Sequence, residues 1–280
     1  MAKSALLKSS IAKKWWMSLT GLFLCVFLVG HLVGNLQLIF GTPLQFNEYA
    51  LFMTTNPAVK VLSYVTYFSI LFHAIDGIML TVQNKKARPV GYAVKNDKVS
   101  STWASRNMAV LGTLLLVFIA THMVNFWAKM HFSQMPLQQQ VVKIANPMSG
   151  IEEEIAVYNF TDGSAAPTNV VEMGQLEIKN GKDFYQAGTD LKVKEGYKDL
   201  YKITVDFFKD PSLGLVFTIF YVLSMVVLGF HLSHGFASAF QSLGLSNPKY
   251  NGLIKTVGLG FSIIVPALFA IIPIYIHFVK

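Results

Sequence analysis

Residues 15–40 read WWMSLTGLFLCVFLVGHLVGNLQLIF and carry no charged side chain. A helix of about 20 apolar residues crosses the hydrocarbon core of a bilayer, so this stretch predicts a transmembrane helix. One histidine, His31, lies near its far end, beside Gly30, Gly34 and Asn35. An imidazole is costly in hydrocarbon unless it has a partner, and it usually faces the interior of a helix bundle. Taken alone, His31 is as compatible with an interhelical hydrogen bond as with a ligand.

Four more apolar segments of similar length follow, and histidines recur in them. The five segments cover residues 15–40, 57–82, 104–130, 211–241 and 253–279. His73 lies in the second segment, His122 in the third, and His231 and His234 in the fourth. The pattern predicts an all-α membrane protein with five transmembrane helices, in which a four-helix bundle carries the histidines and a fifth helix lies beside it. We expect residues 1–280 to form a single membrane domain.

The composition agrees with a membrane protein and excludes other classes. Of the 280 residues, 53% are hydrophobic and 14% are charged, and the mean hydropathy is +0.46. The net charge of +8 comes from basic residues in short loops and at the N-terminus, so it does not indicate nucleic-acid binding. The single cysteine, Cys25, lies inside an apolar segment, which excludes a disulfide framework. The first apolar run exceeds the about 7–15 residues of a signal-peptide core, so it is expected to be retained as a span.

The basic residues also predict an orientation. The N-terminal tail and the loop between the second and third segments are rich in Lys and Arg. The loop between the first and second segments has neither, and its one acid is Glu48. Because basic loops stay in the cytoplasm, we expect the N-terminus inside and the C-terminus outside. The basic loops would also contact anionic membrane lipid.

The long loop at about 131–210 is then expected to lie outside as an insertion. Within it, LEIKNGKDFY alternates around Asn180 and Gly181, which predicts a β-hairpin. GYKDLYKITVDFF predicts an amphipathic helix that leads into the fourth segment. The loop contains no chemical motif, and we interpret it as a cap over the outer face.

The depths of the histidines fall into two pairs. Counted from the cytoplasmic end of each helix at 1.5 Å per residue, His31 lies at roughly 24 Å and His122 at roughly 26 Å. His73 lies at roughly 14 Å and His231 at roughly 15 Å on the same scale. Two haems, each held by two histidines and stacked across the membrane, require this arrangement. The spacing therefore predicts His31, His73, His122 and His231 as iron ligands.

Glycines occur at positions where a flat macrocycle needs a helix face without side chains. Gly77 and Gly235 each follow a predicted ligand by one helical turn, on the same face. Gly21 and Gly112 each precede one by ten residues, near the depth of the other pair. Any one of these glycines is also explained by helix–helix contact, where small residues are common. Their repetition favours the haem interpretation.

The fourth segment offers two histidines for one ligand position. His231 shares the H-x-x-x-G spacing of His73, whereas His234 is adjacent to its glycine. At roughly 10 Å, His234 is also shallower than His73. We therefore expect His231 to be the ligand and His234 to meet a haem propionate or a neighbouring helix.

Four stretches carry a resemblance to a known family: WWMSLTGLFLCVFLVGHLVGN (15–35), FHAIDG (72–77), THMVNFW (121–127) and FHLSHG (230–235). They closely resemble the di-haem cytochrome b subunit of succinate:quinone oxidoreductases and quinol:fumarate reductases. The resemblance implies an anchor in the bacterial cytoplasmic membrane that binds a flavoprotein (FAD) subunit and an iron–sulfur subunit on its cytoplasmic face. It implies two haem b groups that carry electrons to or from a quinone, menaquinone in most relatives of this type. The succinate or fumarate site would lie on a partner subunit.

The resemblance also suggests roles for other positions. Ser18, Arg106 and Gln241 resemble positions that hold haem propionates in relatives, and a surface role is an equal alternative for them. Glu48 would relay protons to the quinone, or would be a solvated loop acid. Some relatives have a glutamate two residues before the fourth ligand. In this chain that position is Gly229.

Two alternatives remain at this point. One is a cytochrome b anchor of a hydrogenase or formate dehydrogenase, which the FHAIDG and FHLSHG motifs disfavour. The other is a transporter or channel without haem, which the scarcity of other ionisable groups in the spans disfavours.

Overall fold

The computed structural model describes residues 9–90, 101–145 and 152–280. Within these ranges, five helices are long and apolar enough to cross a membrane, and the chain is an all-α membrane protein apart from two small sheets. The N-terminal tail, and the part of the basic loop at 91–100, lie outside the described residues. The five spans are α2 (Ser10–Phe40), α4 (Pro57–Ala87), the Met108–Phe132 span, α11 (Gly214–Ser242) and α12 (Pro248–Phe278).

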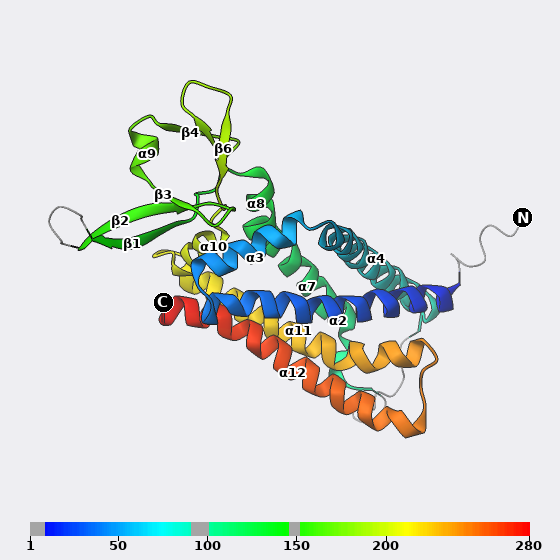
Figure 1. The fold of residues 1–280 in the computed structure, drawn as a ribbon. Coiled ribbons are helices and arrows are strands. Elements are labelled where there is room, and N and C mark those ends of the chain that lie inside the picture. Colours follow the sequence, from blue (N-terminus) through cyan, green and yellow to red (C-terminus); the bar gives the residue numbers. More distant parts are fainter. Residues whose placement is uncertain (1–8, 91–100, 146–151) are drawn as a thin grey trace, which may run out of the picture.

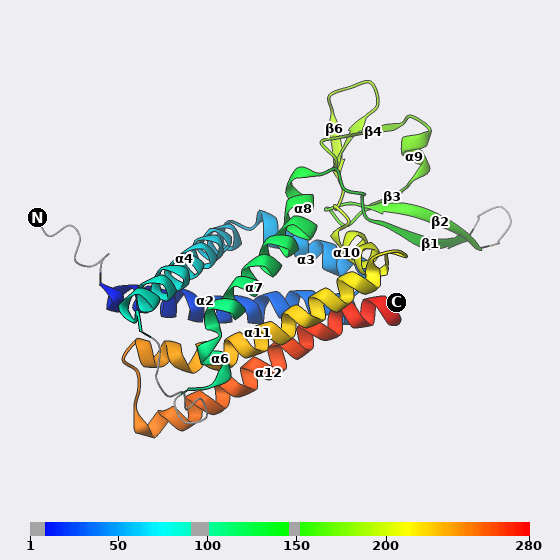
Figure 2. The same ribbon diagram turned by 180° about the vertical axis from the view of Figure 1, so that it is seen from behind.

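The spans lie side by side as a bundle (Figure 1). The start of α2 lies at one end of it, and the C-terminus and both sheets lie at the other, here called the N-terminal end and the sheet end. The third span is composite: α7 (Met108–His122) continues through a π-helical turn, η1 (Met123–Ala128), into α8 (Lys129–Phe132). A short helix, α6 (Trp103–Arg106), precedes it, as seen from behind in Figure 2.

Asn-Pro pairs begin two of the spans. The side chain of Asn56 accepts hydrogen bonds from the backbone of Ala58 and Val59, and Asn247 caps α12 in the same way. The proline that follows each asparagine occupies the first helical turn, where its missing N–H costs nothing. Local sequence therefore fixes where these helices start.

A helix occupies the connection that the sequence suggested was a loop. Helix α3 (Pro43–Thr55) joins α2 to α4 at the sheet end. Thr42 and Gln45 form a capping box at its start, each side chain bonding the backbone of the other residue. The expectation of a loop was wrong because this helix is too short and too mixed in polarity for apolar periodicity to reveal it.

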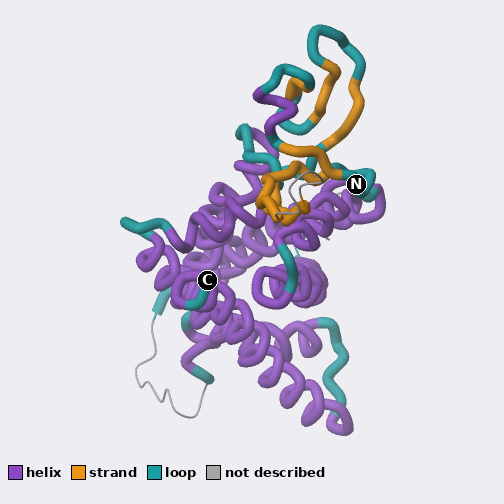
Figure 3. The backbone as a smooth tube through the Cα atoms, turned by 60° about the vertical axis from the view of Figure 1, so that its left-hand side comes forward, coloured by secondary structure: helices purple, strands orange, loops and turns teal. Residues whose placement is uncertain are grey.

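The segment between the third and fourth spans forms two antiparallel sheets of three strands each (Figure 3). The first contains β1 (Gln139–Ala145), β2 (Glu152–Asn159) and β3 (Ala165–Pro167), and the second contains β4 (Leu176–Lys179), β5 (Asp183–Gln186) and β6 (Lys192–Glu195). A short helix, α9 (Asn169–Glu172), connects the sheets. The predicted hairpin is confirmed: β4 pairs with β5 around Asn180 and Gly181, whose φ angles of 55° and 72° suit a two-residue turn.

The predicted amphipathic helix is also present, as α10 (Leu200–Lys209). Its buried residues Thr204 and Phe208 face the bundle, and Phe208 belongs to the same buried cluster as Leu38 and Tyr221. His277 near the end of α12 donates from Nδ1 to the carbonyl of Phe208 at 2.6 Å. Helix α10 therefore covers the sheet end of the bundle.

A buried polar link fastens α10 to α3. Asn47 is 1% exposed, and its side-chain amide donates to Asp199 Oδ1 at 2.9 Å. The amide oxygen of Asn47 accepts from the backbone N–H of Tyr201 at 3.0 Å. Asp199 also caps α10 by accepting from the backbone of Lys202. Both ends of one asparagine side chain are thus satisfied by the start of α10.

We expect Asn47→Ala to loosen this cover. The substitution leaves a buried carboxylate and a backbone N–H without one partner each, which costs about 1–3 kcal/mol. The thermal midpoint of the purified protein should fall, and proteolysis within residues 131–210 should become faster. Asn169→Ala, at an exposed position in α9, is the control and should change neither. Equal behaviour of the two variants would contradict the role of Asn47.

Candidate functional site

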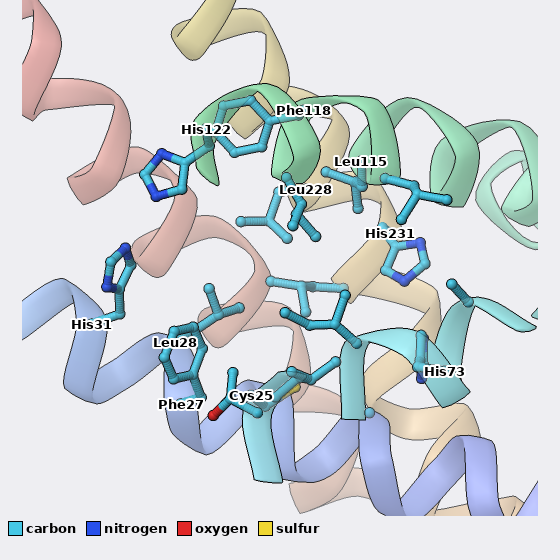
Figure 4. A pocket seen from close by; sticks show the side chains of 18 of the residues that line it. Cys25, Phe27, Leu28, His31, His73, Leu115, Phe118, His122, Leu228 and His231 are labelled. Carbon is cyan, nitrogen blue, oxygen red and sulfur yellow. The ribbon is translucent and has the colours of Figure 1, made fainter. Parts of the chain in front are cut away.

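A cavity of about 990 Å³ lies inside the bundle. All five spans line it, together with α3, α6 and α10, and its wall includes all four predicted ligand histidines. Figure 4 shows two histidine pairs in this cavity, with apolar side chains such as Leu28, Leu115 and Leu228 between them. Ligand pockets are about 300–1,000 Å³, so this cavity is at the upper limit and has room for a large group.

The structure brings the histidines together in the pairs that their depths predict. His31 of α2 faces His122 of α7, with ring centroids 5.8 Å apart and ring planes at 87°. His73 of α4 faces His231 of α11, with centroids 6.1 Å apart and planes at 68°. We call the first the sheet-side pair and the second the N-terminal-side pair. Each pair joins two different helices, and the four helices differ.

These separations fit a metal atom between the two rings of a pair. A nitrogen–metal bond is about 2 Å, and the ring centroid lies about 1 Å behind the nitrogen, so two rings on opposite sides of a metal are about 6 Å apart. No group of three or more His, Cys, Asp or Glu side chains suited to a metal ion occurs in the described ranges. Two histidines are enough only if the ligand itself supplies the remaining bonds, as a haem does.

The hydrogen bonds of the four rings are uneven. In the described part of the chain, Nδ1 of His122 and Nδ1 of His231 are buried without a partner. His73 Nδ1 lies 3.0 Å from the carbonyl oxygen of Met17. Among the described residues, the hydrogen-bond partner of the His31 ring is the amide of Asn35 at 3.4 Å, and that amide also donates to the backbone of His31 at 2.8 Å. Buried ring nitrogens without a partner are rare, so His122 and His231 are not held in place by interhelical hydrogen bonds from Nδ1.

The four predicted glycines all line the cavity, in two different ways. A Cβ added at Gly77 would meet nothing within 4 Å, and one at Gly235 only the tip of Met108 at 4.0 Å. These two positions open onto free space. A Cβ at Gly21 would lie 3.0 Å from His73, and one at Gly112 would lie 3.8 Å from His231. Both therefore lie at the level of the N-terminal-side pair, as their spacing predicts.

The remaining predicted residues divide between the cavity and the surface. Ser18, which is buried, and His234 line the cavity, but the ring that faces His73 is that of His231. Arg106 and Gln241 are exposed and do not line it. The guanidinium of Arg106 instead donates to the carbonyl of Ser101 at 2.5 Å.

Polar residues that the sequence motifs did not single out line the N-terminal end of the cavity. They come from the ends of four elements and are Lys14, Asn84, Ser105, Ser238 and Ser242. None of them belongs to a motif, and Ser105 lies on α6, which has no histidine, so the histidine pattern could not identify them. The sheet end of the cavity is closed instead by α3 and α10, through residues such as Phe46 and Phe208.

A π-helical turn begins directly after His122 and redirects the third span. Within it, Asn125 donates to the hydroxyl of Tyr221 on α11 at 3.2 Å, and Trp127 donates to the hydroxyl of Tyr67 on α4 at 2.8 Å. Turns of this kind are rare and frequent at functional sites. Here the turn anchors the third span to both of its neighbours beside the sheet-side pair.

Glu48 lies outside the histidine cavity, in a shallow pocket at the sheet end. Gln37, Gln45 and Phe52 share this pocket, and Tyr49 lines both it and the histidine cavity. Burial and the negative charge of Glu48 raise the pKa of Tyr197, which places Glu48 close to the sheet segment. The neighbour of Glu48 in the chain, Tyr49, is thus shared by the two pockets.

Gly229 faces α12 rather than the cavity. A Cβ at this position would lie 3.0 Å from the backbone carbonyl of Ser262. A glutamate therefore does not fit here without moving α11 away from α12.

Comparison of the chain with protein families, with curated proteins and with solved structures found no match. The geometry of the cavity and the sequence motifs are therefore what indicate a function for this chain.

The geometry of the N-terminal-side pair predicts different effects for two neighbouring histidines. The sequence predicts two haems, and we expect His231→Ala to lose one of them, because it removes the ring that faces His73. His234→Ala should retain both. The measurement is the haem content of each purified variant by pyridine haemochrome. Loss of a haem in His234→Ala with retention in His231→Ala would reverse the ligand assignment.

Proposed function

We propose that this chain is a di-haem cytochrome b that anchors a succinate:quinone oxidoreductase or quinol:fumarate reductase in the membrane. The observation that carries the proposal is that four histidines form two facing pairs in one large cavity, with ring centroids 5.8 Å apart in one pair and 6.1 Å apart in the other. Their four histidines come from four successive spans of the chain.

The residues around the cavity fit two haem groups. His31 and His122 would hold one haem b, and His73 and His231 the other. Haem iron supplies one-electron redox chemistry when it is bound. The chain would provide two histidine nitrogens to each iron, and it has open space at Gly77. It also provides a mostly apolar wall that keeps water from the irons.

The polar residues at the N-terminal end of the cavity suit the charged edge of a haem. Haem carries two carboxylates, which need hydrogen-bond donors or cations. Lys14, Asn84 and Ser105 supply such groups at that end, together with buried Ser18. We propose that these residues, rather than Arg106 and Gln241, meet the carboxylates of the N-terminal-side haem.

The partner subunits are proposed from the motif resemblance. An iron–sulfur subunit, with a flavoprotein subunit behind it, would dock at the N-terminal end, which would face the cytoplasm of a bacterium. Lys85, Lys86 and Arg88 lie at the end of α4 on that side. Their charge also suits anionic lipid, so either contact accounts for them. Co-purification of the subunits with this chain, and their oxidation of succinate, would identify the complex.

The quinone site is proposed at the sheet end. A quinone needs hydrogen-bond donors for its carbonyl oxygens and a proton source when it is reduced. Gln37, Gln45 and Glu48 offer these groups in one pocket, and Tyr49 connects that pocket with the histidine cavity. Menaquinone is the quinone that the resemblance favours.

The proposal predicts two non-covalent haems per chain. The wild-type protein should show a low-spin b-type spectrum, and a pyridine haemochrome assay should give two haems. His131→Ala is a control, since His131 lies outside the cavity wall, and it should leave the count unchanged. A count of zero would overturn the proposal and favour a transporter or another haem-free membrane protein. A count of one would overturn the assignment of one pair.

The quinone proposal predicts slower quinone-coupled turnover in Glu48→Gln, because the amide cannot relay protons. Electron transfer from the partner subunits to a soluble dye should stay the same. Glu172→Gln, which changes an exposed acid of α9, is the matched control. Unchanged quinone turnover in Glu48→Gln would show that Glu48 is a solvated surface acid.

A further inference from the structure

Of the four paired histidines, His73 makes a strong hydrogen bond to another helix through its Nδ1. His73 Nδ1 lies 3.0 Å from the carbonyl oxygen of Met17 and 3.4 Å from the hydroxyl of Thr20, both on α2. Its partner ring, His231, has a buried Nδ1 that finds no acceptor in the described residues. The two rings of one pair therefore differ in what holds them.

Gly21 makes the contact with Met17 possible. It lies four residues after Met17, so the two share one face of α2. A Cβ at Gly21 would lie 3.0 Å from Cε1 and 3.4 Å from Nδ1 of His73, which is too close for an undisturbed ring. The His73 imidazole packs against the backbone of α2 at Gly21. A side chain here would push it away from the carbonyl.

Gly112 shows that this closeness is specific to Gly21. It occupies the equivalent place on α7, ten residues before His122, and it faces His231. A Cβ at Gly112 would lie 3.8 Å from His231, which is an ordinary contact. The two glycines have the same spacing in the sequence but act differently in the structure.

We propose that Gly21 and Thr20 are positioning residues that hold His73 on the carbonyl of Met17. This contact places the proton of the ring on Nδ1 and leaves Nε2 free to bind iron, and the inference rests on the proposed haem function. A hydrogen bond from Nδ1–H to a carbonyl makes the other nitrogen a stronger donor to a metal. The stronger donor favours oxidised iron, so this contact lowers the midpoint potential of the N-terminal-side haem.

The first test compares Gly21→Ala with Gly112→Ala. Gly21→Ala should raise the midpoint potential of one haem and change its low-spin EPR signal, because the ring leaves the Met17 carbonyl. The other haem should keep its potential. Gly112→Ala, which adds the same methyl group, should shift neither. The component that is missing from His231→Ala identifies the N-terminal-side haem in the titration.

The second test does not depend on steric pressure, so it remains decisive if Gly21→Ala loses haem. Thr20→Val removes the weaker acceptor at almost constant volume and should give a smaller shift of the same haem in the same direction. Thr20→Ser keeps a hydroxyl and should restore the wild-type potential. Thr218→Val is the control, since Thr218 is a buried threonine whose hydroxyl bonds only the backbone of its own helix.

The outcomes separate this inference from the proposed function. Two haems in the wild-type protein, with potentials that neither Gly21→Ala nor Thr20→Val moves, would overturn the positioning role alone. A shift confined to the sheet-side haem, or an equal shift in Gly112→Ala, would overturn it as well. A wild-type protein without haem would overturn the proposed function and this inference together.

Discussion

The structure depends on how buried imidazoles are satisfied. A buried polar group without a hydrogen bond costs about 1–3 kcal/mol, and four histidines lie inside this apolar bundle. His73 alone has a strong partner from another helix, whereas Nδ1 of both His122 and His231 has none in the described residues. Interhelical hydrogen bonds therefore do not explain His122 and His231. The ring centroids of the two pairs lie 5.8 Å and 6.1 Å apart, which leaves room for one metal atom between the two rings of each pair.

The two ends of the cavity differ in chemistry, and the difference follows from what covers them. Serines, an asparagine and a lysine line the N-terminal end. At the sheet end, α10 lies across the bundle and is held by Asn47 on one side and His277 on the other. The cover brings aromatic rings such as Phe208 to the cavity wall. A ligand with one charged edge and one apolar edge suits the N-terminal end, whereas α3 and α10 cover the sheet end.

Local signals in the sequence predicted much of this architecture. The five spans followed from the length of apolar runs, the pairing of histidines from their depth, and the hairpin from Asn180 and Gly181. Helix α3, the π-helical turn and the contact between His73 and Met17 were not predicted. The first has a short mixed sequence. The second is a change of hydrogen-bond pattern within one span, and the third depends on how closely α2 and α4 approach. The family resemblance suggested that Arg106 and Gln241 hold haem propionates, with a surface role as an equal alternative, and the structure places both on the surface.

The glycines show most clearly what a spacing rule contains and what it omits. Spacing placed Gly21, Gly77 and Gly112 on the cavity wall, and the structure agrees. It could not distinguish a glycine that leaves space for a ligand from one that seats a side chain. Gly77 has nothing within 4 Å of its added Cβ, whereas Gly21 lies against His73 and Gly229 lies against the backbone of α12. Only the first kind is explained by a flat group in the cavity. Gly21 acts one step earlier, because it seats the His73 ring that would bind that group.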